Sequence, residues 1–70
     1  MSNIPSITPK DIIRILKQKG FVLDRSHGSH QIWLHPVSRK RAVVPMHKKD
    51  LPVGTMYSIL KQAGIDKDEL

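Results

Sequence analysis

The sequence contains no cysteine, which excludes disulfide bonds, thiolate metal sites and cysteine nucleophiles together. It has no apolar run close to the roughly 20 residues that a membrane-spanning helix needs. With 70 residues, the chain has the size of one small domain. We expect a single unit over residues 1–70 with an ordered core at residues 8–65. The first residues, Met1 to Pro5, have neither a basic leader nor an apolar segment, so we expect a cytoplasmic protein.

Acidic residues are scarce, and they are missing from the middle of the chain. The sequence has 12 Lys and Arg against 6 Asp and Glu, a net charge of +6 at pH 7. No carboxylate occurs between Arg25 and Lys49, and all four histidines lie in that segment. Such a basic segment is typical of a surface that binds a polyanion such as RNA. The side chains that we expect to bind RNA are Arg25, Arg39, Lys40, Arg41, Lys48 and Lys49.

Two amphipathic helices are predicted, one near each end of the chain. Thr8 is a good helix cap and precedes a proline, and Gly20 can end the helix in the left-handed conformation. The second helix begins near Pro52, or at the residue after Gly54, since glycine inside a helix costs up to about 1 kcal/mol relative to alanine. Gly64 ends it. The residues after 65 are expected to fray.

Three short strands are predicted between the helices, at residues 21–23, 30–35 and 41–44. Polar turn formers end the first strand and prolines end the other two. In the second strand, two residues on one side (Ile32 and Leu34) alternate with three on the other (Gln31, Trp33 and His35). Trp33 therefore either packs in the sheet core or, if its side of the sheet is open, offers a ring for base stacking.

The order of these elements is α-β-β-β-α. Short connections predict an antiparallel meander, and a three-stranded sheet needs one covered face, which the two helices can provide. We therefore expect an α+β sandwich with both helices on one face of the sheet. This arrangement resembles the double-stranded-RNA-binding fold, although a fold alone does not define a function.

The segment His27-Gly28-Ser29-His30 carries the most chemistry. It places two imidazoles around a flexible turn, and imidazole can accept and donate a proton near neutral pH. RNA can be cleaved without a metal, because its ribose 2′-hydroxyl supplies the nucleophile. The alternative is that these histidines are ordinary polar residues of a turn and a strand. The histidine spacings match no known zinc site, so no metal or cofactor is expected.

Several short motifs occur in the order found in one known family: Gly28-Ser29-His30, Trp33, His35-Pro36, Val44-Pro45 followed by His47, and Gly54-Thr55 followed by residues 59–65. With this set the chain resembles the HicA toxin family over residues 12–65. Two positions depart from the family pattern. His27 stands where a lysine, an arginine or another polar residue is common, and Trp33 replaces the more usual tyrosine or phenylalanine.

The resemblance implies a metal-independent endoribonuclease toxin, an mRNA interferase of a type II toxin–antitoxin system, which a HicB-like antitoxin inhibits. It implies that His30 is the catalytic residue, as general base, general acid or both, and that His47 has a supporting role. Gly28 and Ser29 would shape the approach of the phosphate, and we expect Arg39 and Arg41 to stabilise its charge. Two alternatives stay open: a non-enzymatic RNA-binding module of the same fold, and a basic domain that binds only an acidic protein.

Overall fold

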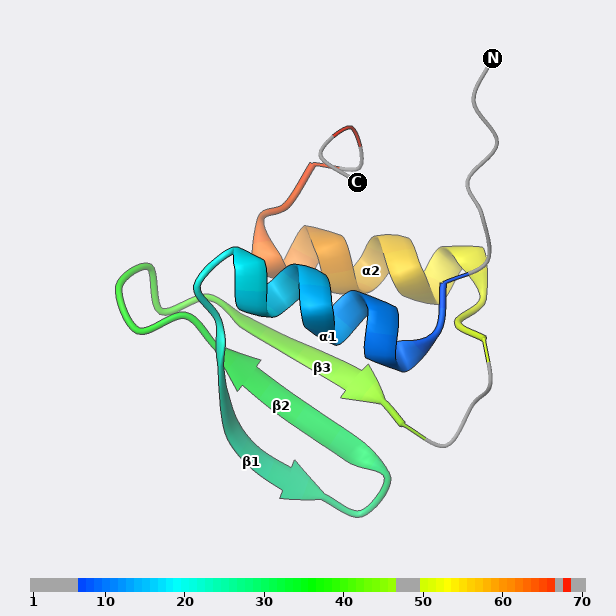
Figure 1. Cartoon of the computed structure of the whole chain (residues 1–70), viewed down its shortest axis with the longest axis horizontal. Coiled ribbons are helices and arrows are strands. Elements are labelled where there is room, and N and C mark those ends of the chain that lie inside the picture. Colours follow the sequence, from blue (N-terminus) through cyan, green and yellow to red (C-terminus); the bar gives the residue numbers. More distant parts are fainter. Residues whose placement is uncertain (1–6, 47–49, 67, 69–70) are drawn as a thin grey trace.

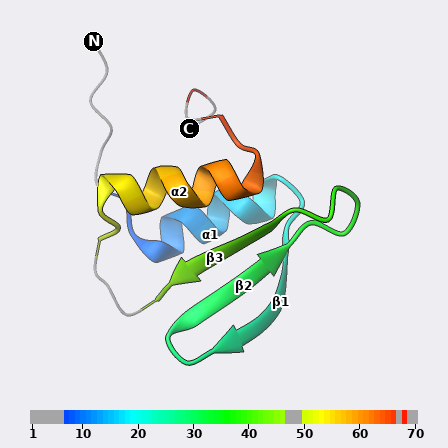
Figure 2. The ribbon, with the colours of Figure 1, turned by 180° about the vertical axis from the view of Figure 1, so that it is seen from behind.

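The computed structural model describes residues 7–46, 50–66 and 68 (Figure 1). The elements, in chain order, are α1 (Pro9–Gln18), β1 (Val22–His27), β2 (His30–Leu34), β3 (Arg41–Pro45) and α2 (Val53–Ala63). The strands form one antiparallel sheet in the order β1-β2-β3, and both helices lie on the same side of it (Figures 1 and 2). The predicted α-β-β-β-α sandwich is confirmed. No helix in the described part of the chain is long and apolar enough to cross a membrane.

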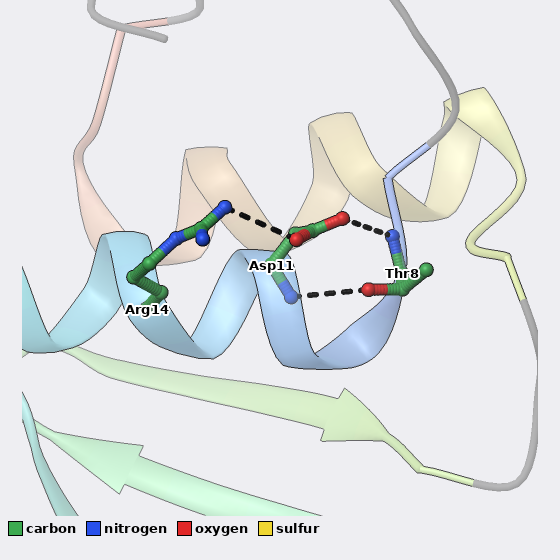
Figure 3. Close-up of polar contacts among 3 residues, drawn as sticks. All are labelled: Thr8, Asp11 and Arg14. Carbon is green, nitrogen blue, oxygen red and sulfur yellow. Dashed lines mark hydrogen bonds and ion pairs between the residues drawn. The ribbon is translucent and has the colours of Figure 1, made fainter.

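Helix α1 begins with the predicted cap (Figure 3). The Thr8 hydroxyl accepts a hydrogen bond from the Asp11 backbone N–H at 3.2 Å, and the Asp11 carboxylate accepts one from the Thr8 backbone N–H at 3.1 Å. This capping box satisfies two backbone donors that a helix start leaves unpaired. Arg14, one turn later, donates to the other Asp11 oxygen at 3.1 Å. The cap sets where α1 starts and therefore which of its residues face the sheet.

The cap makes the stability of the protein depend on acid. The Thr8 backbone N–H, then the Thr8 hydroxyl, hold the pKa of Asp11 below its ordinary value. A carboxyl whose pKa is lowered by folding stabilises the protein above its unfolded pKa, near 4, and loses this effect as pH falls through the folded pKa. We expect the unfolding free energy of the wild-type protein to fall with acidification below about pH 4. The fall should be smaller in Thr8→Ala, which retains the backbone donor, and smallest in Asp11→Asn, which has no carboxyl group at this position. Urea unfolding followed by circular dichroism between about pH 2.5 and 7 measures the slope. An unchanged slope in Asp11→Asn would contradict the assignment.

Strand β1 is longer than the sequence predicts. The predicted strand covered residues 21–23, whereas β1 runs from Val22 to His27. Its polar residues form a strand because β2 satisfies their backbone groups, which outweighs their weak strand propensity. An irregularity between Leu23 and Arg25 absorbs one extra residue, as in a β-bulge. Phe21 lies before the strand and is buried. Helix α2 begins at Val53, as the sequence predicts, and includes Gly54.

The core lies between the helices and two of the three strands. Its buried side chains include Ile12 and Leu16 from α1, Met56, Ile59 and Leu60 from α2, Trp33 from β2, and Ala42 and Val44 from β3. The helices lie over the β3 side of the sheet, and β1 lies farthest from them (Figures 1 and 2). Every residue of β1 is consequently exposed, including Val22 and Leu23, which are 52% and 48% exposed.

Candidate functional site

The β1–β2 hairpin brings two histidines together at one end of the sheet. Its two-residue turn consists of Gly28 and Ser29, and the strand register places His27 directly opposite His30. Gly28 has a φ of 61°, and a positive φ at the first of two turn residues suits glycine in such a hairpin. The Ser29 carbonyl accepts a hydrogen bond from the backbone N–H of Met46, just beyond β3, at 2.6 Å. The turn is therefore tied to the third strand.

Both histidines lie on the open face of the sheet, away from the helices. Side chains alternate along a strand, and the buried Trp33 shows which face of β2 meets the helices. His30, three positions earlier, therefore belongs to the other face. Residues directly opposite in an antiparallel pair share a face, so His27 lies beside His30, and Arg25, which pairs with Ile32, lies one step along the same face.

We call Arg25, His27 and His30 the histidine face. All three are exposed. Arg25 makes an ion pair with Asp24 at 3.4 Å, and its side chain is 67% exposed, so this pair is weak and leaves the guanidinium accessible to another anion. Arg25 lies two residues from His27, about 7 Å along the strand, and His27 lies opposite His30. An arginine side chain at this position can therefore reach a phosphate held at His30. All three residues stand out in the sequence, but a first strand that ends at residue 23 does not place Arg25 beside the two histidines. The two-residue Gly28-Ser29 turn was the signal that could have found this arrangement.

Trp33 is a core residue, and its expected role in RNA binding is wrong. Its side chain is 5% exposed, its indole N–H donates to Oε1 of the Gln31 side chain at 3.2 Å, and the Lys17 ammonium lies 5.8 Å from the ring centroid. The helices cover the face of β2 that carries Trp33, so no ring face is available to stack on a base.

The basic residues of the β2–β3 turn lie far from His30. Arg41 pairs with Leu34, four residues from His30, which corresponds to about 13 Å along the strand. Arg39 is in the turn beyond that pair, where its backbone N–H donates to the His35 carbonyl at 2.9 Å. The expectation that these two arginines stabilise a phosphate at His30 stays a prediction, and Arg25 lies closer to His30 than either of them. At this separation both arginines are better placed to contact a more distant part of a bound RNA.

Lys40 is directed toward the end of helix α2. A Cβ atom added at Gly64, the C-terminal cap of α2, would collide with the Lys40 ammonium. A cation at a helix C-terminus is stabilised by the unpaired carbonyls and the helix dipole. The structure thus places the positive charge of Lys40 at the C-terminus of α2, a position that the sequence did not reveal.

His35 is a structural histidine. Its Nδ1 accepts hydrogen bonds from the backbone N–H groups of Val37 and Ser38, each at 3.1 Å, and its ring meets Phe21 edge-on with centroids 5.2 Å apart. An acceptor Nδ1 means that the neutral ring carries its proton on Nε2. His35 therefore closes the β2–β3 turn and lies on the helix-facing side of β2, away from His30.

Three residues of the expected site, the supporting residue His47 and the RNA-binding residues Lys48 and Lys49, lie outside the described residues. Among the residues that are described, no group of three or more His, Asp or Glu side chains is placed to hold a metal ion. A family model with the description "HicA toxin of bacterial toxin-antitoxin" matches residues 9–65. A search of curated proteins finds no match.

Proposed function

This chain belongs to the HicA toxin family of bacterial toxin–antitoxin systems, and we propose that it is a metal-independent endoribonuclease that cuts mRNA in the cytoplasm. The observation that supports this most strongly is the histidine face. It combines an exposed imidazole, His30, with a second imidazole and an accessible guanidinium on an open sheet surface. These are the groups that RNA cleavage by the 2′-hydroxyl requires: a proton acceptor, a proton donor and a positive charge.

His30 is the proposed catalytic residue. In the reaction the ribose 2′-oxygen attacks the adjacent phosphorus, so the protein has only to move protons and stabilise the charge on the phosphate. The Gly28-Ser29 turn beside His30 has open space around Gly28, where an added Cβ would meet no atom within 4 Å. A phosphate can therefore approach the turn backbone closely, and backbone N–H groups there can donate to it. Arg25 lies close enough to stabilise the charge.

The remaining basic residues are proposed to hold the RNA outside the reaction centre. Arg41 lies on the open face at the opposite end of β2, and Arg39 is exposed in the adjoining turn. A strand of RNA that runs along the sheet would meet Arg25 and Arg41 in succession. We include Lys48 and Lys49 as further phosphate contacts and His47 as a supporting residue, on the family resemblance and the basic sequence around them.

A toxin of this family has a cognate antitoxin, and we propose that a HicB-like protein inhibits the chain by covering the histidine face. The open face is suited to protein binding as well as to RNA. At the opposite end of the β1–β2 pair from the histidines it carries Val22, which is 52% exposed and lies opposite the half-buried Leu34. Exposed apolar side chains next to charged ones are typical of a protein interface.

Cleavage of RNA by the purified chain tests the proposed function. We expect the protein to cut a single-stranded RNA in the presence of EDTA, to leave the DNA of the same sequence intact, and to produce 2′,3′-cyclic phosphate ends. DNA is the matched control, because it lacks the attacking 2′-hydroxyl and otherwise differs only in having thymine, with its extra methyl group, in place of uracil. Binding of RNA without any cleavage would instead support the RNA-binding module. Binding of neither nucleic acid would favour the basic protein-binding domain.

A further inference from the structure

His27 and His30 form a cross-strand pair on one face of the sheet. They flank the two-residue turn and lie directly opposite each other in the register, which places their Cβ atoms about 4.5–5.5 Å apart. Both side chains are exposed. The turn has a defined geometry, with a positive φ at Gly28 and a hydrogen bond from Met46 to the Ser29 carbonyl. The separation of the two Cβ atoms, from which the imidazoles extend, is therefore set by the hairpin backbone.

We propose that His27 is a second catalytic residue, and that the two histidines divide the proton transfers of RNA cleavage between them. This inference rests on the proposed ribonuclease function and adds a residue to the same site. In-line cleavage places the attacking and leaving oxygens on opposite sides of phosphorus. A single imidazole would have to move from one oxygen to the other, whereas two imidazoles on adjacent strands can flank the phosphate, each within the 2.6–3.2 Å or so that proton transfer needs.

The reaction balances within the pair. The neutral imidazole accepts the proton of the 2′-hydroxyl as the 2′-oxygen forms its bond to phosphorus. The bond between phosphorus and the 5′-oxygen breaks, and the 5′-oxygen receives a proton from the protonated imidazole. The products are a 2′,3′-cyclic phosphate and a 5′-hydroxyl. The two histidines end with the same total of protons as at the start, and no other reactant enters.

The surroundings of the pair are compatible with this role. His30 lies between His27 of β1 and Pro45 of β3. Pro45 has no titratable group. Arg25 on β1, with its ion-pair partner Asp24, and Arg41 at the far end of β3 provide the other charges on the described strands. The helices lie on the other side of the sheet (Figures 1 and 2). A cation at Arg25 favours binding of the phosphate between the two rings.

The pH dependence of cleavage tests the pair. One imidazole must be neutral and the other protonated, so cleavage by the wild-type protein should follow a bell-shaped curve with pH. We expect His27→Gln to lower the rate about 10²-fold and to remove one limb of the curve, with RNA affinity nearly unchanged. The matched control is the double variant Ser26→His, His27→Ser. It has the same composition but moves the imidazole to the position opposite Gln31, on the other face of the sheet, and it should be as slow as His27→Gln.

A modified RNA identifies which histidine is the acid. A 5′-sulfur in place of the 5′-oxygen is a leaving group that needs no proton from an acid. This RNA should therefore restore the cleavage rate of the variant that has lost the acid, either His27→Gln or His30→Ala. It should not restore the rate of the variant that has lost the base. A His27→Gln protein with wild-type rate and an unchanged bell-shaped curve would overturn the proposal, as would rescue of neither variant. In those cases a slow His30→Ala would still support the ribonuclease function, whereas a wild-type rate in His30→Ala would refute the catalytic assignment of His30 itself.

Discussion

Replacing His30 with alanine should reduce RNA cleavage by about 10²–10⁴-fold, because that is the contribution of a positioned acid or base. His30 is exposed at the start of β2 and takes no part in the buried core, so its removal should leave the fold intact. RNA affinity should change little, since phosphate binding comes mainly from lysine and arginine. Cleavage under single-turnover conditions and RNA binding at the same salt concentration measure the two effects separately.

His35→Ala is the histidine control for this experiment. It removes an imidazole on the helix-facing side of β2, and with it two hydrogen bonds that close the β2–β3 turn. We expect it to lower the thermal stability while a folded sample retains most of its cleavage activity.

In the cell, His30→Ala should abolish growth arrest and His35→Ala should not, provided that the protein accumulates. A folded His30→Ala protein that cuts RNA at the wild-type rate would exclude His30 as the catalytic residue. Equal losses of binding and cleavage would favour a plain RNA-binding protein.

The Trp33→Ala variant should be strongly destabilised. Removal of a buried tryptophan costs about 3–5 kcal/mol, and a chain of this length has a total stability of roughly 4–10 kcal/mol. The variant also loses the hydrogen bond to Gln31 and the contact with Lys17. Urea unfolding followed by circular dichroism measures the loss, which should appear as a lower transition midpoint or as the absence of a folded baseline.

Trp33→Phe separates a core role from a role in RNA binding. Phenylalanine keeps an aromatic ring but is smaller and lacks the indole N–H, so we expect an intermediate stability and nearly wild-type RNA affinity in the folded protein. If Trp33 stacked on a base, Trp33→Ala would remain folded and bind RNA more weakly by the roughly 1–3 kcal/mol that a stacked base contributes. A stable Trp33→Ala protein with that binding defect would contradict the buried position.

Much of the fold follows from local signals in the sequence. Thr8 and the proline after it predict the start of α1, and the structure shows the cap in full. Gly64 predicts the end of α2, and it has the expected left-handed conformation. The prolines predicted to end the second and third strands lie close to the observed ends: β2 ends at Leu34, two residues before Pro36, and β3 ends at Pro45 itself. These signals succeed because a helix cap, a positive φ and a missing N–H act within a few residues of the chain. The ordered motifs around Gly28-Ser29-His30 likewise identify the family, which the match over residues 9–65 confirms.

The composition of the site depends on contacts between strands, which local signals do not contain. The sequence alone determined the element order, the basic middle segment and the preference for His30. The tertiary structure decided which face of β2 is covered, and it thereby assigned Trp33 to the core and His30 to the open surface. It also extended β1 to His27, since pairing with β2 outweighs the weak strand propensity of those polar residues. Side chains alternate along a strand with a period of two, so a shift of one residue moves a side chain to the other face of the sheet. The face and register of each strand are therefore set by its partner strands and by the helices that cover it. The observed pairing places Arg25 and His27, rather than Arg39 and Arg41, next to His30.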